Sequence, residues 1–280
     1  MRILEVRDLS KTYPAFRLDQ VSFSLEPGKI TGFIGRNGAG KTTTLRSLMN
    51  FIHPDEGSVQ FFGQSFGEAE QAIKSQVGFV SGGVDFYPEK KLRSITAVTQ
   101  SFYDNWDDSA YRDCLRRFNL DENKTPKQLS EGMKVKYALT LALSHHAQLL
   151  ILDEPTSGLD PVSREELLDD FLALSRQGTT IFFSTHITSD LDKCADNILY
   201  IQKGRIRAEQ PLSQFVGAYR AVELSQAQYE QANQAKLIGC KRSKHGYTAL
   251  IRKEDATNIA VPANAADLDT IMVHLEQEGA

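Results

Sequence analysis

The sequence predicts an α/β fold that carries a helical insertion and is followed by a small α+β domain. Strand-like runs alternate with helical runs from about residue 2 to residue 208, as expected for a sheet covered by helices. Between residues 91 and 147 helical patterns dominate, and after about residue 217 shorter patterns begin. We therefore predict a large domain over residues 1–217, with a helical subdomain at about 86–147, and an accessory domain over 218–280.

The first elements of the large domain are predicted to be strands. Residues 21–25 alternate apolar and polar side chains, which is typical of a strand with one buried face. Residues 30–34 form a short apolar run that follows a Pro-Gly turn. Residues 57–63 have glycine at both ends of another strand-like run.

The later elements follow from the same patterns. After the insertion, the sequence predicts strands at residues 148–152, 179–184 and 196–202, and a helix at 161–176. The accessory domain is expected to hold strands at 221–224 and 247–251 and helices at 226–236 and 266–277. The last helix has its apolar side chains at helical spacing, namely Leu268, Ile271, Met272 and Leu275.

Composition excludes several classes of protein. The chain of 280 residues has 41% hydrophobic and 24% charged residues, as ordinary globular proteins do. Its net charge of −4 argues against a dedicated nucleic-acid binder. The charged N-terminus does not resemble a signal peptide, and the apolar runs are far shorter than the roughly 20 residues that span a bilayer. Three scattered cysteines, Cys114, Cys194 and Cys240, indicate reduced thiols in a cytoplasmic protein. A membrane role would therefore require a partner.

A glycine-rich loop is the most informative segment of the chain. Residues 35–42 fit the pattern G-x-x-x-x-G-K-[ST] and lie between the strand at 30–34 and a helix expected at 43–51. Glycines let successive N–H groups point at a polyphosphate, and the helix N-terminus adds a positive dipole end. Lys41 is expected to reach the β- and γ-phosphates, and Thr42 to ligate Mg²⁺. The predicted nucleotide-binding residues of this segment are Gly35, Asn37, Gly38, Ala39, Gly40, Lys41, Thr42 and Thr43.

Two acidic residues follow the apolar run at 149–152. Asp153 and Glu154 stand where a strand of the sheet would carry them to the phosphate loop. Asp153 is expected in the Mg²⁺ shell, and Glu154 is expected to orient or deprotonate the attacking water. The loop and the acidic pair together predict a nucleoside triphosphatase.

Four segments resemble motifs of the ATP-binding cassette (ABC) ATPases. Residues 153–160, Asp-Glu-Pro-Thr-Ser-Gly-Leu-Asp, are similar to their Walker B motif and D-loop, and residues 129–133, Leu-Ser-Glu-Gly-Met, to their signature. His186, after Ser-Thr, resembles their switch histidine, and Tyr13 occupies the place of their aromatic A-loop residue. The match in order and spacing covers about residues 2–210 and looks most like the ATPase subunits of bacterial ABC-2-type exporters.

The resemblance implies a fold and a mechanism. It implies a P-loop core of ABC type with an antiparallel β subdomain and a helical subdomain. Two copies, or one copy and a paralogous subunit, would pair head to tail, with each ATP between the phosphate loop of one and Ser130 and Gly132 of the other. Ser130 would cap the helix that follows it, His186 would assist Glu154, and Tyr13 would stack on adenine. Asp160 would lie at the dimer interface.

The same resemblance implies the binding partners of the chain and its location in the cell. The expected cofactor is Mg²⁺ and the substrate is ATP, with no nucleic acid bound. A separate transmembrane permease would hold the chain at the inner face of the cell membrane. The transported substrate and the direction of transport are not readable from the cassette.

Two positions depart from the family pattern. The family carries a glutamine after the strand that ends at Val80 here, but the matching position is Gly82, and Gln76 precedes the strand. Water or Asp85 would complete the metal shell instead. Glu131 stands where the signature usually has glycine, and a carboxylate there would repel a triphosphate unless it turned away. We therefore expect a low basal ATPase rate.

Three questions stay open from sequence. The aromatic residues of the insertion either form a docking surface for the membrane subunit or pack the insertion itself; they are Phe86, Tyr87, Phe102, Tyr103 and Trp106. The chain could also be an ABC-type ATPase that acts without a membrane partner, although it has one cassette, no C-x-x-C motif and an acidic balance. The accessory domain could serve regulation or dimerisation. The remaining histidines, His53, His145, His146, His245 and His274, are expected at the surface or in packing.

Overall fold

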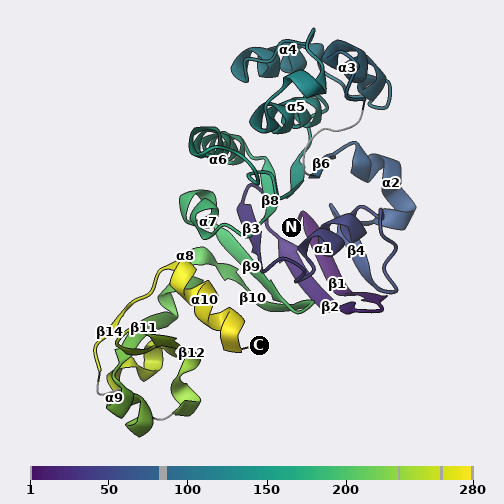
Figure 1. The fold of residues 1–280 in the computed structure, drawn as a ribbon. Coiled ribbons are helices and arrows are strands. Elements are labelled where there is room, and N and C mark those ends of the chain that lie inside the picture. The colour runs from purple at the N-terminus through teal and green to yellow at the C-terminus, as the bar shows by residue number, and fades with distance from the viewer. Residues whose placement is uncertain (1, 82–86, 233, 259–260, 279–280) are drawn as a thin grey trace.

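The computed structural model describes residues 2–81, 87–232, 234–258 and 261–278. These residues form three sheets, with the helical subdomain and the C-terminal unit at opposite ends of the molecule (Figure 1). The central sheet has six strands in the order β10-β9-β3-β8-β7-β6. Its strands are β10 (Arg205–Pro211), β9 (Asn197–Gln202), β3 (Ile30–Ile34), β8 (Thr180–Thr185), β7 (Leu149–Asp153) and β6 (Val77–Ser81). All neighbours are parallel except β10 and β9.

The centre of this sheet is buried on both faces. Every residue of β3, β7 and β8 is buried, which explains why these strands read as apolar runs rather than as alternating patterns. Successive side chains of β7 point to opposite faces. Leu149 and Ile151 therefore join one apolar cluster, and Leu150 and Leu152 join the other.

An antiparallel sheet covers one face of the central sheet. Its strands are β2 (Phe16–Leu25), β1 (Leu4–Tyr13), β4 (Glu56–Phe61) and β5 (Gln64–Ser65), in that order. Phe23 of β2 packs against Phe182 of β8, with ring centroids 5.4 Å apart. Helices α1 (Lys41–Leu48) and α2 (Phe66–Lys74) complete this side.

The helical subdomain contains α3 (Leu92–Gln100), α4 (Asp108–Arg117) and α5 (Glu131–Ser144). Tyr137 of α5 is fully buried at its centre, where its hydroxyl lies 2.9 Å from Thr96 Oγ1 and donates to the Leu92 carbonyl. Burial raises the pKa of Tyr137 above its usual value. A single buried hydroxyl network thus ties the three helices together, since Thr96 Oγ1 also lies 3.0 Å from the Tyr111 hydroxyl.

The other face of the central sheet is covered by α6 (Pro161–Arg176), α7 (Thr188–Cys194) and α8 (Leu212–Gly217). The C-terminal unit follows, with sheet order β12-β13-β11-β14. Its elements are β11 (Tyr219–Leu224), α9 (Gln226–Gln231), β12 (Ile238–Ser243), β13 (Gly246–Arg252), β14 (Ala263–Ala265) and α10 (Leu268–Glu278).

Several predicted elements need correction. The helix expected at residues 43–51 begins earlier, at Lys41, and ends at Leu48, because Asn50 adopts a left-handed backbone with φ 57°. The helix expected at 226–236 ends at Gln231, and a separate 3₁₀ turn covers Gln234–Lys236. Strand β12 was not predicted, because its last three residues are exposed and the strand lies at a sheet edge.

The C-terminal unit shares its core with the rest of the chain. Leu250, Leu268 and Ile271 belong to the same buried cluster as Leu150 and Phe183 of the central sheet. The division of the chain at residue 217 therefore stays a prediction about folding units. No helix among the described residues has the length and apolar character that crossing a membrane requires.

Candidate active site

The phosphate loop joins β3 to α1, and two glycines allow its shape. Gly40, at the N-cap of α1, has φ 114°, a conformation that side chains disfavour. Gly35 is packed so closely that a Cβ atom there would lie 2.3 Å from the Ile201 carbonyl oxygen of β9. The loop can therefore lie against β9 only because residue 35 has no side chain.

A cavity of about 420 Å³ opens above this loop. It is lined by Phe16, Asn37, Gly38, Gly40, Lys41, Thr42, Thr43 and Glu154. Seven of these eight residues were predicted from sequence, and Phe16 was missed because it belongs to no motif. Of the other predicted loop residues, Ala39 is buried, and Gly35 lies in a neighbouring groove with Arg36 and His186.

Asp153 meets Thr42 at the end of β7. Its Oδ1 atom accepts hydrogen bonds from Thr42 Oγ1 at 3.1 Å and from Ser184 Oγ at 2.7 Å. The carboxylate is almost fully buried. A hydroxyl and a carboxylate are the hard oxygen ligands that Mg²⁺ uses when phosphates and water complete its shell. No group of three His, Cys, Asp or Glu that could hold a metal occurs among the described residues. Thr42 and Asp153 supply two hard oxygens, and this donor set fits Mg²⁺ that is shared with a nucleotide.

Glu154 occupies a strained position between the side chains of Lys41 and His186. Its backbone has φ 53°, a left-handed conformation that costs a non-glycine residue about 1–3 kcal/mol. Its Oε1 lies 3.3 Å from Lys41 Nζ, and its Oε2 lies 2.7 Å from His186 Nδ1. Two predicted site residues from different segments thus contact the carboxylate of a third.

Ser184 is a site residue that was quoted in the histidine motif but given no role. Its hydroxyl donates to Asp153 and accepts from the backbone N–H of Glu154 at 2.9 Å. It therefore fixes both acidic residues at once. A serine near the end of a fully buried apolar strand was the available signal, since a buried hydroxyl needs a hydrogen-bond partner.

Asp190 is a second residue that sequence reasoning missed. It is completely buried on α7, and its Oδ2 accepts from Thr156 Oγ1 at 2.6 Å and from Thr185 Oγ1 at 3.2 Å. Arg164 Nε lies 3.9 Å from Asp190 Oδ1. This network connects the segment after Glu154 to the segment before His186.

The signature segment lies on a separate surface. Ser130 Oγ accepts from the Met133 N–H at 3.3 Å, which confirms its predicted role as the cap of α5. Ser130 and Gly132 line a groove with Lys136, Ser163 and other residues, none of which lines the phosphate cavity. In Figure 1, α5 and α1 lie in different parts of the molecule. One chain thus does not bring Ser130 and Gly132 to its own phosphate loop.

The unusual Glu131 is paired within its own helix. Its Oε1 lies 2.7 Å from Lys134 Nζ, at the i,i+3 spacing of α5. A neighbouring ammonium offsets the charge that a triphosphate would otherwise meet.

Two further predicted residues have local partners. Tyr13 lies at the end of β1, 38% exposed, with its ring 6.5 Å from that of Phe16. Asp160 caps α6: it accepts from the Ser163 hydroxyl at 2.6 Å and from the N–H groups of Ser163 and Val162. These hydrogen bonds, that of the Ser163 hydroxyl foremost, lower the pKa of Asp160. Adenine stacking by Tyr13 and an interface role for Asp160 stay predictions.

The aromatic residues of the insertion do not form one cluster. Tyr103 stacks on His145 with ring centroids 3.9 Å apart, and Trp106 packs against Tyr111 at 5.7 Å. Phe102 and Tyr87 are exposed. Phe86 lies outside the described residues, as do Asp85 and Gly82, the position at which the family carries its glutamine.

The cysteines are free, as expected. Burial raises the pKa of Cys114 to about 11 and that of Cys194 to about 12. Both thiols are therefore protonated and unreactive at neutral pH.

Comparison with known proteins gives the family. The model of the ABC transporter family matches residues 18–157. The bacitracin transport ATP-binding protein BcrA of Bacillus licheniformis is 33% identical over 213 residues, which cover 75% of this chain and 70% of that protein. The Nod factor export ATP-binding protein I of Burkholderia orbicola is 32% identical over 212 residues, covering 74% and 70%.

A solved structure agrees with these relatives. An ATP-binding subunit of an ABC transporter superposes with a TM-score of 0.68 at 28% identity, covering 76% of this chain and 91% of that one. The predicted P-loop core of ABC type is thereby confirmed. This chain belongs to the ATP-binding cassette transporter family, as one of its ATP-binding subunits.

Proposed function

We propose that this chain is the ATP-hydrolysing motor of a membrane exporter and works as a head-to-tail dimer with two nucleotides at its interface. The observation that supports this proposal is the separation of two half-sites. Lys41, Thr42, Asp153, Glu154 and His186 converge at one edge of the sheet, whereas Ser130 and Gly132 lie on another surface. A second chain would supply the missing signature.

Each residue of the first half-site has a separate role in hydrolysis. Lys41 and the N–H groups of the loop bind the β- and γ-phosphates. Thr42 and Asp153 would hold Mg²⁺, which would supply positive charge to the phosphate oxygens. Glu154 orients a water molecule in line with the γ-phosphate and takes its proton, while His186 holds the glutamate in place.

The membrane partner is proposed from the relatives. Their names describe transport of bacitracin and export of Nod factor, and we propose export by a separate permease for this chain as well. The chain would then work at the inner face of the membrane. Co-purification with a permease from detergent-solubilised membranes tests this partner, and recovery of the chain only from the aqueous fraction would contradict it.

The dimer is tested by mixing two inactive variants. Lys41→Ala removes the phosphate lysine, and Ser130→Phe blocks the signature. Each variant alone is expected to lose ATP hydrolysis. In a mixed head-to-tail dimer, one of the two sites carries both defects and the other carries none, so mixing is expected to restore hydrolysis. A mixture that stays as inactive as its components would contradict the composite site.

A second experiment measures assembly directly. Glu154→Gln keeps the side-chain shape but removes the base, so Mg·ATP is expected to accumulate the closed dimer. Light scattering after size exclusion reports the mass with and without Mg·ATP. The double variant Glu154→Gln, Ser130→Phe is the matched control and is expected to remain a monomer.

A further inference from the structure

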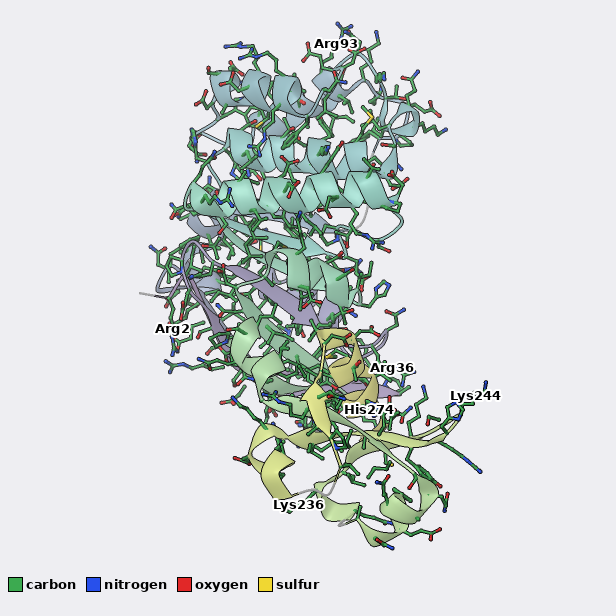
Figure 2. All side chains as sticks on the ribbon, turned by 90° about the vertical axis from the view of Figure 1, so that its left-hand side faces the viewer. Arg2, Arg36, Arg93, Lys236, Lys244 and His274 are labelled. Carbon is green, nitrogen blue, oxygen red and sulfur yellow. The ribbon has the colours of Figure 1, made fainter. Side chains whose placement is uncertain are left out.

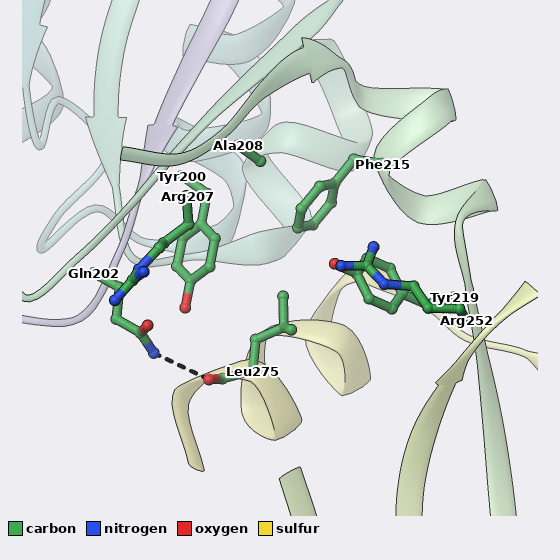
Figure 3. Close-up of a pocket in the computed structure, with 8 residues that line it drawn as sticks. All are labelled: Tyr200, Gln202, Arg207, Ala208, Phe215, Tyr219, Arg252 and Leu275. Atoms are coloured by element: carbon green, nitrogen blue, oxygen red, sulfur yellow. Dashed lines mark hydrogen bonds between the residues drawn. The ribbon is translucent and has the colours of Figure 1, made fainter. Parts of the chain in front are cut away.

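A second cavity lies between the edge of the central sheet and the C-terminal unit (Figure 3). Its volume is about 320 Å³, within the range of roughly 300–1,000 Å³ that is usual for small-molecule sites. The lining residues come from β9, β10, α8, β11, β13 and α10; they are Tyr200, Gln202, Arg207, Ala208, Phe215, Tyr219, Arg252 and Leu275. None of them lines the phosphate cavity.

The floor of this cavity is aromatic and preformed. Phe215 is 1% exposed and packs edge-on against Tyr200 at 6.3 Å and against Tyr219 at 5.6 Å. The Tyr200 hydroxyl donates to Glu276 at 3.0 Å, and the Gln202 amide donates to the Leu275 carbonyl at 3.0 Å. These bonds fix α10 as one wall, so an apolar body could enter without rearrangement of the floor.

Two arginines border the cavity from different elements. Arg207 belongs to β10, and Arg252 ends β13, with its guanidinium 4.7 Å from the centre of the Tyr219 ring. Neither arginine forms an ion pair with any residue that the structure describes, and no Asp or Glu is among the lining residues there. The Glu276 carboxylate lies beside the cavity as the acceptor of the Tyr200 hydroxyl, and neither arginine forms an ion pair with it. The two guanidinium groups therefore suit an anion.

We propose that this cavity binds a small organic anion with one carboxylate, sulfonate or phosphate group and an apolar body. Guanidinium groups match the planar or tetrahedral oxygens of such an anion through paired N–H donors. The apolar body would lie against Phe215, Tyr200 and Leu275. The site is distinct from the nucleotide site and does not depend on the proposed export function.

Helix α10 contacts both this cavity and the groove beside the phosphate loop. Leu275 lines the cavity, while Met272 and Val273 of the same helix line a groove with Arg36 and His186. Figure 2 shows Arg36 next to this helix. An anion that packs on Leu275 would therefore contact the helix that flanks the phosphate loop.

The test uses two probes that share an anilinonaphthalene body and differ by one sulfonate group. The full chain is saturated with Mg·ADP and titrated with 8-anilino-1-naphthalenesulfonate, followed by fluorescence. Binding of one probe per chain is expected, and the uncharged analogue N-phenyl-1-naphthylamine should bind at least about tenfold more weakly. Arg207→Ala and Arg252→Ala should each weaken binding of the sulfonate about tenfold or more, with little effect on the uncharged probe.

Matched variants distinguish binding in this cavity from nonspecific binding of the probe elsewhere on the protein. Arg205→Ala removes a charge from the same strand, outside the cavity, and should leave sulfonate binding unchanged. Ala208→Trp fills the cavity and should abolish binding while both arginines remain, with the melting temperature checked for folding. Equal affinity for both probes, or equal effects of the Arg205 and Arg207 variants, would overturn the proposal.

Discussion

At the scale of single residues, Ser184 shows how one side chain positions the two acidic residues of the site. One hydroxyl donates to Asp153 and accepts from the Glu154 N–H. The proposed metal ligand and the proposed base are therefore positioned by the same atom. Removing that atom should affect metal use more than folding.

We expect Ser184→Ala to raise the Mg²⁺ concentration needed for half-maximal ATP hydrolysis by roughly 10–100-fold, because residues that orient metal ligands have effects of that size. The measurement is ATP turnover against Mg²⁺ at saturating ATP. Thr44→Ala is the control, since Thr44 is also buried but bonds only to the Gly40 carbonyl. Similar Mg²⁺ curves for all three proteins would contradict the role of Ser184.

His145 predicts how stability depends on pH. It is buried, stacks on Tyr103, and its Nδ1 lies 3.0 Å from the Ser75 carbonyl oxygen. Burial lowers the pKa of His145 below its ordinary value of 6.5. The unfolded chain therefore binds a proton in the range just below pH 6.5 that the folded chain does not bind. The contribution to stability is complete above that pH and is lost as the pH falls through the window below it.

Acidification from pH 7.5 to 5.5 should therefore lower the melting temperature of the wild type more than that of His145→Phe. Phenylalanine keeps the stacking surface but cannot be protonated, so the variant is less stable at pH 7.5 and less sensitive to acid. Calorimetry at each pH measures the difference between the two proteins. His53→Phe, at an exposed position, should keep the wild-type slope. A steeper acid dependence in His145→Phe would show that the sign is wrong.

At the scale of elements, helix α5 combines a structural cap with a proposed catalytic contact. Ser130 caps the helix through its hydroxyl, and such caps are worth about 1 kcal/mol. The same hydroxyl would face the nucleotide of a second chain. The two roles can be separated because asparagine also caps helices well.

Ser130→Ala should lower the free energy of unfolding by about 1 kcal/mol and also reduce ATP hydrolysis. Ser130→Asn should restore the stability but not the hydrolysis, since its longer side chain cannot reproduce the contact with a phosphate. Urea unfolding and steady-state turnover give the two values. Full activity in Ser130→Asn would leave capping as the only role of this residue.

The elements also show what a sequence can predict. The strands β3, β7 and β8 were predicted because burial on both faces leaves an apolar run. Lys41 and Asp153 were predicted because each belongs to a motif with a fixed spacing. Phosphate binding and metal binding require these residue types at these positions relative to the strands. Strand β12 and Phe16 were not predictable, because an exposed edge strand and a single aromatic residue acquire their role only from neighbours distant in sequence.

At the scale of the whole molecule, the C-terminal unit and the ATPase core share one buried cluster. Leu268 and Ile271 of α10 pack in the cluster that contains Leu150 of the central sheet. Units that share a core cannot unfold separately without exposing that core. The predicted division at residue 217 would then separate two architectures that unfold together as one cooperative unit.

Calorimetry of the nucleotide-free chain should therefore show a single unfolding transition. Ile271→Ala should lower its midpoint without splitting it, at a cost of about 2–5 kcal/mol. Val273→Ala, on the exposed side of the same helix, should change the midpoint little. Two separate transitions in the wild type would show that the units unfold independently.

The strained backbone of Glu154 affects which variants a selection for thermal stability would favour. Glycine or asparagine would relax φ 53° there, yet neither can accept the proton of the attacking water. Selection of a variant library for thermal stability alone would thus enrich more stable proteins that no longer hydrolyse ATP. Screens on this scaffold should combine thermal survival with catalytic output, since at this position the two properties favour different amino acids.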